Sequence, residues 1–178
     1  MTTAGEIRTL LLLRHAKSSW SDPDLPDFQR PLSKRGREAA PSMGREMRRR
    51  GWLPDLALVS TAVRTRQTWQ LVAAELDAPI PTRFEASIYE APATDILEVI
   101  RTVPDDVRTL LVVGHNPGLE DAAAIIAGPD SATPVMKRLR EKYPTGALAL
   151  FRTRAAWRDL DERGAALTDF IVPKDIAS

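Results

Sequence analysis

The stretch TLLLLRHAKSSW, residues 9–20, joins four consecutive leucines to Arg14, His15, Ala16 and Lys17. A continuous apolar run of this kind is typical of a strand that is buried on both faces, as the strands of a parallel sheet are. His15 is one of only two histidines in the chain. We therefore expect a buried strand that carries an arginine, a histidine and a lysine to its carboxyl end.

Two further apolar runs, Leu56–Val59 and Thr109–Val113, are also predicted strands, and a helical pattern follows each of the three. Another helix is predicted around Ile96–Val103, and two more strands are predicted at Ala147–Phe151 and Ala166–Val172. The predicted helix boundaries are Ser33 and Gly51 for the first helix, Ser60 or Thr61 for the start of the second, and Pro117 and Gly128 for the third. Pro41 interrupts the first helix and is expected only in its first turns.

Strands that alternate with helices predict the α/β class. We expect one domain over residues 1–178, a three-layer α/β/α sandwich with a mainly parallel central sheet. Ligands of such sheets bind beyond the carboxyl ends of the strands. Three segments of this sequence are predicted to lie there, namely residues 14–17, 60–66 and 114–118.

Composition excludes several classes of function. The chain has 25 basic and 24 acidic residues, so it has no overall field that would attract nucleic acid or an anionic membrane. It has no cysteine, which excludes disulfides, zinc thiolates and cysteine-based catalysis. No apolar run approaches the roughly 20 residues of a membrane span. We expect a cytoplasmic, monomeric protein that binds neither nucleic acid nor membrane.

The chemistry at the predicted strand ends favours an anion as the ligand. His115, the second histidine, follows the strand Thr109–Val113, and Arg64 lies one turn into the helix after Leu56–Val59. Guanidinium groups and helix N-termini bind phosphate well, whereas a metal site needs more ligands than two imidazoles. We therefore expect a phosphate site without a metal or another cofactor.

Four segments in order carry a family resemblance: LLLRHA at the end of the first strand, PLSKRGREAA at residues 31–40, STAVRTRQTW at residues 60–69 and LLVVGHNPGL at residues 110–119. Together they resemble the histidine phosphatase superfamily, and most of all its short branch of SixA phosphohistidine phosphatases. The resemblance implies a phosphoglycerate mutase-like fold. Ala16 stands where the family usually has glycine, and Asn116 stands where its acid phosphatases have aspartate.

The resemblance implies that His15 is the nucleophile and forms a phosphohistidine intermediate. Arg14, Arg64 and a protonated His115 would hold the charge of the transferred phosphoryl group. Glu90 is the expected proton donor, with Asp22 and Asp24 as alternatives in the first loop. The expected substrate contacts are Lys17, Ser18, Ser21 and Asn116.

The predicted function is that of a metal-independent phosphohydrolase, with phosphohistidine in a protein as the preferred substrate. Two alternatives stay open at this point. One is hydrolysis of small phosphate esters or nucleotide phosphoanhydrides. The other is a catalytically inactive module that binds phosphate.

Overall fold

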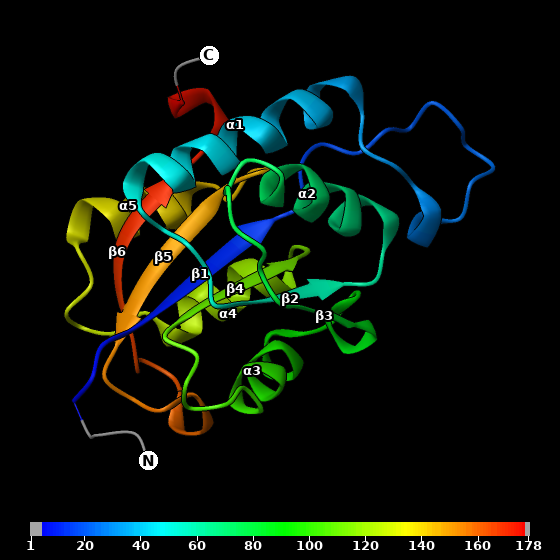
Figure 1. Ribbon diagram of the computed structural model, residues 1–178. Helices are drawn as coiled ribbons and strands as arrows, with labels where there is room; N and C mark the ends of the chain where they lie inside the picture. The colour runs from blue at the N-terminus through cyan, green and yellow to red at the C-terminus, as the bar shows by residue number, and fades with distance from the viewer. Residues whose placement is uncertain (1–4, 177–178) are drawn as a thin grey trace.

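The computed structural model describes residues 5–176 and contains a six-stranded sheet with the strand order β3-β2-β4-β1-β5-β6 (Figure 1). The strands are β1 (Arg8–Arg14), β2 (Leu56–Ser60), β3 (Thr82–Glu85), β4 (Thr109–Gly114), β5 (Leu148–Thr153) and β6 (Ala166–Ile171). Strands β3, β2, β4 and β1 are parallel, whereas β5 pairs antiparallel with both β1 and β6. The prediction of a mainly parallel sheet is confirmed.

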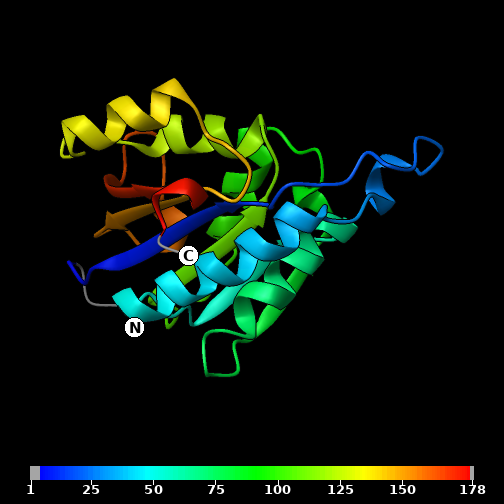
Figure 2. The ribbon, with the colours of Figure 1, turned by 90° about the horizontal axis from the view of Figure 1, so that it is seen from above.

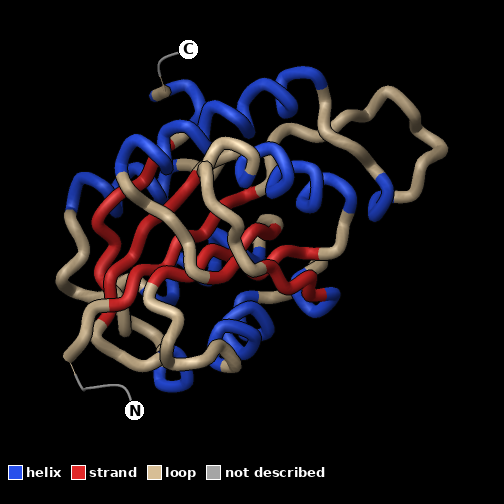
Figure 3. The backbone as a smooth tube through the Cα atoms, in the orientation of Figure 1, coloured by secondary structure: helices blue, strands red, loops and turns tan. Residues whose placement is uncertain are grey.

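Helices cover both faces of this sheet, as the view from above in Figure 2 shows. Figure 3 shows the same arrangement with the helices in blue and the strands in red. They are α1 (Lys34–Arg50), α2 (Val63–Ala73), α3 (Ala93–Arg101), α4 (Gly118–Ile126) and α5 (Thr133–Glu141). Apolar residues of α1 and α2 pack on one face, and those of α3, α4 and α5 pack on the other. The predicted three-layer α/β/α sandwich is therefore confirmed.

The four leucines of β1 divide between the two layers. Leu10 and Leu12 pack with α3 and α4, while Leu11 and Leu13 pack with α1 and α2, and none is more than 1% exposed. Burying one such side chain stabilises a fold by about 1.5–3 kcal/mol. The continuous apolar run is thus explained by two cores, one on each side of the strand.

Two elements were not predicted. Strand β3 has four residues, lies at the edge of the sheet and carries the 53% exposed Phe84, so it has no continuous apolar run. Helix α5 has a single buried residue, Leu139, and its charged sequence gives little periodic signal. Both elements depend on neighbouring structure more than on their own sequence.

Several helix boundaries differ from those predicted. Ser33 and Gly51 do bound α1, and the side chain of Ser33 accepts a hydrogen bond from the Gly36 N–H. However, α2 begins after Ala62, because Ser60 is still the last residue of β2. Helix α4 ends at Ile126, and Gly128 instead donates its N–H to the Ala165 carbonyl. Pro41 lies inside α1, beyond the first turns where it was expected.

No helix within residues 5–176 is long and apolar enough to cross a membrane.

Candidate active site

The carboxyl ends of β1 and β4 bring the two histidines together. Arg14 and Gly114 are paired in the sheet, and the His15 N–H donates to the Gly114 carbonyl at 3.1 Å. The next residue after Gly114 is His115, so both histidines follow neighbouring parallel strands. Their ring centroids lie 5.3 Å apart. Residues that are a hundred positions apart in sequence thus line one small volume.

The ring of His15 is held in one tautomer. Its Nδ1 lies 2.7 Å from the carbonyl oxygen of Ala16, and because a carbonyl only accepts, Nδ1 carries the proton. Nε2 is then left with its lone pair. Burial lowers the pKa of His15 to about 4, and the positive charges of Arg64 and Arg14 act in the same direction. The ring is therefore neutral at pH 7, as a nucleophilic imidazole must be.

The turn that carries this carbonyl is fixed to α2. The Ala16 N–H donates to Thr68 Oγ1 at 3.0 Å, and that hydroxyl donates to the Arg64 carbonyl. Ala16 is fully buried and is not among the described residues with positive φ, so an alanine fits where the family usually has glycine.

His115 is bound to a residue whose role was not predicted. Its Nε2 lies 2.7 Å from Ser60 Oγ, and its buried Nδ1 has no hydrogen-bond partner among residues 5–176. Burial, His15 and Arg64 lower the pKa of His115 to about 3. With the protein's own charges alone the ring is neutral, whereas the family resemblance implies a protonated ring when it holds a phosphoryl group. Ser60 had been considered only as a helix cap, and nothing in its local sequence indicates a contact 55 residues away.

Arg64 is held by an aspartate from the first loop. This buried guanidinium donates from Nη1 to the Asp27 carbonyl at 2.8 Å and from Nη2 to Asp27 Oδ2 at 3.1 Å. Asp27 also accepts from Tyr89 and from Arg30, at 2.6 and 2.9 Å. The hydrogen bond from Tyr89 and those from the two arginines lower the pKa of Asp27 to about 2, although burial opposes them. Asp27 is therefore a carboxylate that orients Arg64.

Asp27 and Tyr89 were both missed from the sequence, which named Asp22 and Asp24 of the same loop, and only as alternatives to Glu90 for the proton donor. Those two are exposed, and the Asp22 carboxylate accepts the backbone N–H of Asp24. The ring of Tyr89 lies 5.5 Å from that of His115, in an edge-to-face arrangement. No local pattern marks either residue, because their proximity is made by the path of the loop.

Arg14 is positioned by the segment before β5. Its Nη1 donates to the Tyr143 carbonyl at 2.9 Å, and Asn116 Nδ2 donates to the same oxygen at 3.0 Å. Burial lowers the pKa of Arg14 from its ordinary value. The Nε atoms of Arg14 and Arg64 are buried and have no partner within the described residues.

A pocket of about 590 Å³ adjoins His115. Its lining includes Arg64 and Asn116, and the three carboxylates of Asp27, Glu90 and Asp121. Glu90 has a φ of 52°, a left-handed conformation that residues other than glycine seldom adopt. This predicted proton donor lines the same pocket as His115.

The other predicted substrate contacts lie elsewhere. Lys17 is exposed and lines a different pocket. Ser18 Oγ accepts from Arg30 at 2.8 Å, and Ser21 is exposed and shares a hydrogen bond with Ser19. None of the three lines the pocket beside His115. Their contact with a phosphate stays a prediction.

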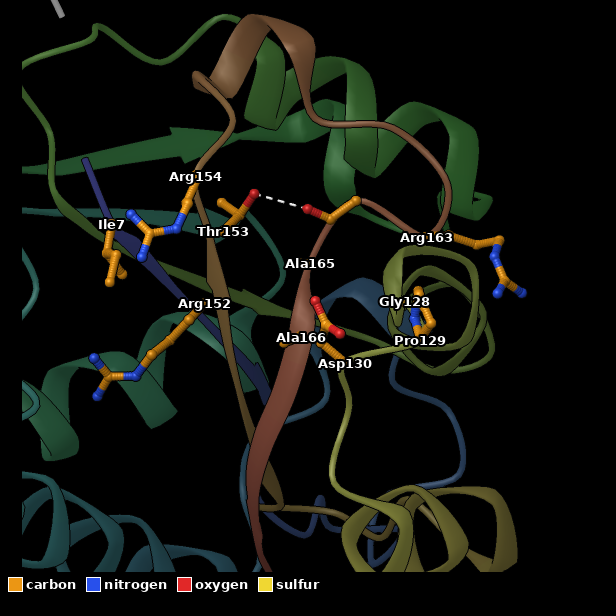
Figure 4. A pocket seen from close by; sticks show the side chains of 11 residues that line it. Ile7, Gly128, Pro129, Asp130, Arg152, Thr153, Arg154, Arg163, Ala165 and Ala166 are labelled. Atoms are coloured by element: carbon orange, nitrogen blue, oxygen red, sulfur yellow. Dashed lines mark hydrogen bonds between the residues drawn. The ribbon is translucent and has the colours of Figure 1, made fainter. Parts of the chain in front are cut away.

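Within residues 5–176 no group of three or more His, Cys, Asp or Glu side chains is arranged to hold a metal ion. A second hollow of about 340 Å³, drawn in Figure 4, is lined by Ile7, which precedes β1, and by residues 128–130, 152–154 and 163–166. Figure 4 shows that two of its arginines, Arg152 and Arg163, point away from each other. The hydrogen bond from Thr153 Oγ1 to the Gly164 carbonyl closes one wall at 2.7 Å. Neither histidine lines this hollow, and neither Arg14 nor Arg64 does.

The family model of the histidine phosphatase superfamily (branch 1) matches residues 10–117. The chain belongs to the histidine phosphatase superfamily. The matched range runs from β1 to the turn after His115 and contains Arg14, His15 and Arg64. Strands β5 and β6 lie outside it, although β5 completes the sheet beside β1.

Relatives extend the similarity over almost the whole chain. An uncharacterized protein of Mycobacterium tuberculosis (strain H37Rv) is 39% identical over 165 residues, which cover 91% of this chain and 100% of that protein. A structure from Nakamurella multipartitia, described as a candidate phosphohistidine phosphatase SixA, has a TM-score of 0.81 at 32% identity and covers 96% of this chain and 99% of its own. A similarly described structure from Agrobacterium tumefaciens has a TM-score of 0.78 at 31% identity, covering 93% and 98%. The phosphoglycerate mutase-like fold expected for this superfamily member is thus confirmed.

Proposed function

We propose that this histidine phosphatase superfamily member hydrolyses phosphohistidine in a protein, with His15 as the nucleophile. The observation that carries the proposal is the Nδ1 contact of His15 with the Ala16 carbonyl. It leaves the Nε2 lone pair of a neutral ring available beside His115 and Arg64. The similarity to the two SixA-type structures supports the same substrate class.

The reaction has two steps. In the first, His15 Nε2 attacks phosphorus, an N–P bond forms, and the P–N bond to the substrate imidazole breaks. The leaving imidazole takes up a proton from solvent or from Glu90. In the second step water attacks the phosphoryl group on His15, which releases inorganic phosphate and restores the neutral ring.

Arg14, Arg64 and His115 would bind the three outer oxygens of the phosphoryl group. Preorganised donors at such positions stabilise charge that develops in the transition state. The unpaired Nδ1 of His115 supports this assignment, because a buried nitrogen without a partner costs about 1–3 kcal/mol. The negative charge of a bound phosphoryl group would raise the pKa of His115 and favour its protonated form.

The charge of the adjoining pocket favours phosphohistidine over anionic small molecules. Three carboxylates line it together with one guanidinium, that of Arg64. A leaving imidazole is neutral once it has taken up one proton and cationic with a second, so these carboxylates do not repel it. A nucleotide or a bisphosphate would instead place a second anion beside Asp27, Glu90 and Asp121.

Trapping of a labelled phosphoenzyme tests the nucleophile. After mixing with a ³²P-phosphohistidine peptide, the wild-type enzyme should carry acid-labile label, and His15→Ala should carry none. His115→Ala is the matched control: it should still be labelled but turn over about 10²–10³ times more slowly, the scale for losing one transition-state donor. Activity should persist in EDTA. Label that remains in His15→Ala would overturn the proposal, and a wild-type protein that binds tungstate without any turnover would be a binding module instead.

A further inference from the structure

Another pocket lies near the candidate active site, and its charged lining residues are lysines and an arginine. It has a volume of about 300 Å³ and includes the exposed side chains of Lys17, Arg35, Lys142 and Lys174. Thr145 adds a hydroxyl, and Pro144 and Pro173 add apolar surface. No aspartate or glutamate of the described part of the chain lines it, although acidic residues almost equal basic ones in the full sequence.

The four cations are not neutralised by neighbouring carboxylates. None of them takes part in an ion pair within residues 5–176. Asp175, next to Lys174, pairs with Arg138 instead. Glu141, next to Lys142, lines another pocket. Like charges gathered in one hollow repel one another, and an anionic ligand would relieve that repulsion.

The pocket begins within two residues of the proposed nucleophile. Lys17 follows His15 by two positions, a chain distance of at most about 7 Å. Thr145, which also lines the pocket, precedes Gly146, whose N–H donates to the carbonyls of Arg14 and His15. Gly146 has a φ of 78° and packs so closely on Pro173 that a Cβ would lie 2.9 Å from it. The same segment therefore holds the end of β1 and forms the basic pocket.

The basic pocket shares no lining residue with the pocket beside His115, called the acidic pocket because Asp27, Glu90 and Asp121 line it. Lys142, Thr145 and Lys174 come from segments beside β5 and β6, whereas Arg64 and His115 follow β2 and β4. A small phosphate ester bound at His15 with its leaving group in the acidic pocket has no further group that could reach the cations. A protein substrate has such groups on the surface around its phosphohistidine.

We propose that the pocket formed by Lys17, Arg35, Lys142 and Lys174 binds aspartate or glutamate side chains of the phosphorylated protein substrate. The inference rests on the proposed function, because it names what surrounds the phosphohistidine. The acidic pocket accepts the leaving imidazole and the basic pocket accepts the flanking carboxylates. The two charges together orient the substrate across the end of β1.

The test compares two phosphohistidine peptides of equal length, one with glutamates and one with glutamines around the phosphohistidine. The enzyme variants are Arg35→Gln/Lys174→Gln and the control Lys137→Gln/Arg152→Gln, which removes the same charge from two exposed residues outside this pocket. In the first variant we expect kcat/KM for the acidic peptide to fall about five- to tenfold at low salt, the scale of losing two exposed ion pairs. The control variant and the glutamine peptide should change by less than about twofold. The difference should vanish in 1 M salt, where the screening length is about 3 Å.

Each other outcome is decisive. Equal losses in both variants would assign the effect to overall charge and overturn the proposal, as would a wild-type enzyme that does not prefer the acidic peptide. A higher inhibition constant for inorganic phosphate against p-nitrophenyl phosphate in Arg35→Gln/Lys174→Gln would show that the pocket takes free phosphate, which also overturns it. If the proposed function itself were wrong, the wild-type enzyme would hydrolyse neither the acidic peptide nor the glutamine peptide. That result differs from each of the outcomes above.

Discussion

Asp27 Oδ2 lies 3.1 Å from Arg64 Nη2, and the Asp27 carbonyl accepts from Nη1 of the same guanidinium. The carboxylate also accepts from Tyr89 and Arg30, so it joins the first loop to the active-site edge of the sheet. Asp27 thus does two things to Arg64 that oppose each other. It fixes the direction of the guanidinium, and it offsets part of the positive charge that a phosphate would use.

Asp27→Asn should separate these two effects. We expect kcat to fall about tenfold, because Arg64 loses its orientation and a misplaced group costs rate. The inhibition constant of inorganic phosphate should fall severalfold, because the guanidinium no longer shares its charge with a carboxylate. Steady-state kinetics with phosphate as an inhibitor measure both. Asp24→Asn is the control, since it removes a carboxylate from the same loop, whereas it is Asp27 that pairs with Arg64. Weaker phosphate binding in Asp27→Asn would contradict this account.

The pH dependence of stability follows from the two buried histidines. Their pKa values are lowered to about 4 and about 3, against about 6.5 in an unfolded chain. Below pH 6.5 the unfolded state therefore binds protons that the folded state does not. The contribution of the two neutral rings to the free energy of unfolding is fully present above pH 6.5. It is lost progressively as the pH falls from 6.5 through about 4 for His15 and about 3 for His115.

Urea unfolding at pH 7.5 and pH 5 measures this loss. Each ring should account for a decrease of about 2 kcal/mol in the free energy of unfolding between these two pH values, given 1.36 kcal/mol for one pKa unit. The chain has only two histidines, so His115→Gln should remove about half of the histidine contribution. The same pH dependence in the wild type and in His115→Gln would show that His115 is not held neutral by its surroundings.

The role of Glu90 is tested by the leaving group. An alkoxide needs a positioned acid, an aid worth about 10²–10⁴ in rate, whereas a leaving imidazole takes up its proton near neutral pH. We expect kcat/KM to be much higher for a phosphohistidine peptide and for p-nitrophenyl phosphate than for an alkyl phosphate. Glu90→Gln should leave the first two within a fewfold of the wild type, and Asp121→Asn removes a carboxylate from the same pocket as a control. Equal wild-type rates on all three, with a collapse for the alkyl ester alone in Glu90→Gln, would instead make Glu90 a full general acid.

Tyr143 contributes to stability and to the active site through different atoms. Its buried hydroxyl donates to the Leu12 carbonyl in β1, and its own carbonyl accepts from Arg14. Tyr143→Phe should therefore lower the free energy of unfolding by about 1–2 kcal/mol and leave kcat/KM within about twofold. Tyr89→Phe, at the only other tyrosine, should lower kcat/KM, because Asp27 loses a hydrogen-bond donor. It should leave the free energy of unfolding nearly unchanged, because Tyr89 is half-exposed. Denaturation curves and initial rates of both variants decide the point.

Much of the architecture follows from local sequence. The leucines of residues 10–13 are apolar on both faces, and only a strand between two layers of helices buries both. The side-chain cap of Ser33 and the left-handed Gly51 at the end of α1 are also local, since each depends on a backbone geometry that its residue type favours. Arg14, His15, Arg64 and His115 could be singled out because strand ends of one parallel edge are neighbours.

What only the tertiary structure decided are the contacts that join distant segments. Asp27 and Arg64 are 37 positions apart, and Ser60 and His115 are 55 apart, yet hydrogen bonds join the members of each pair. Lys17 follows the proposed nucleophile by two positions but lines the basic pocket with Lys142 and Lys174. Periodicity and capping act over a few residues, so they determine strands and helices. The path of a loop is set by whatever it packs against, and that depends on the whole fold.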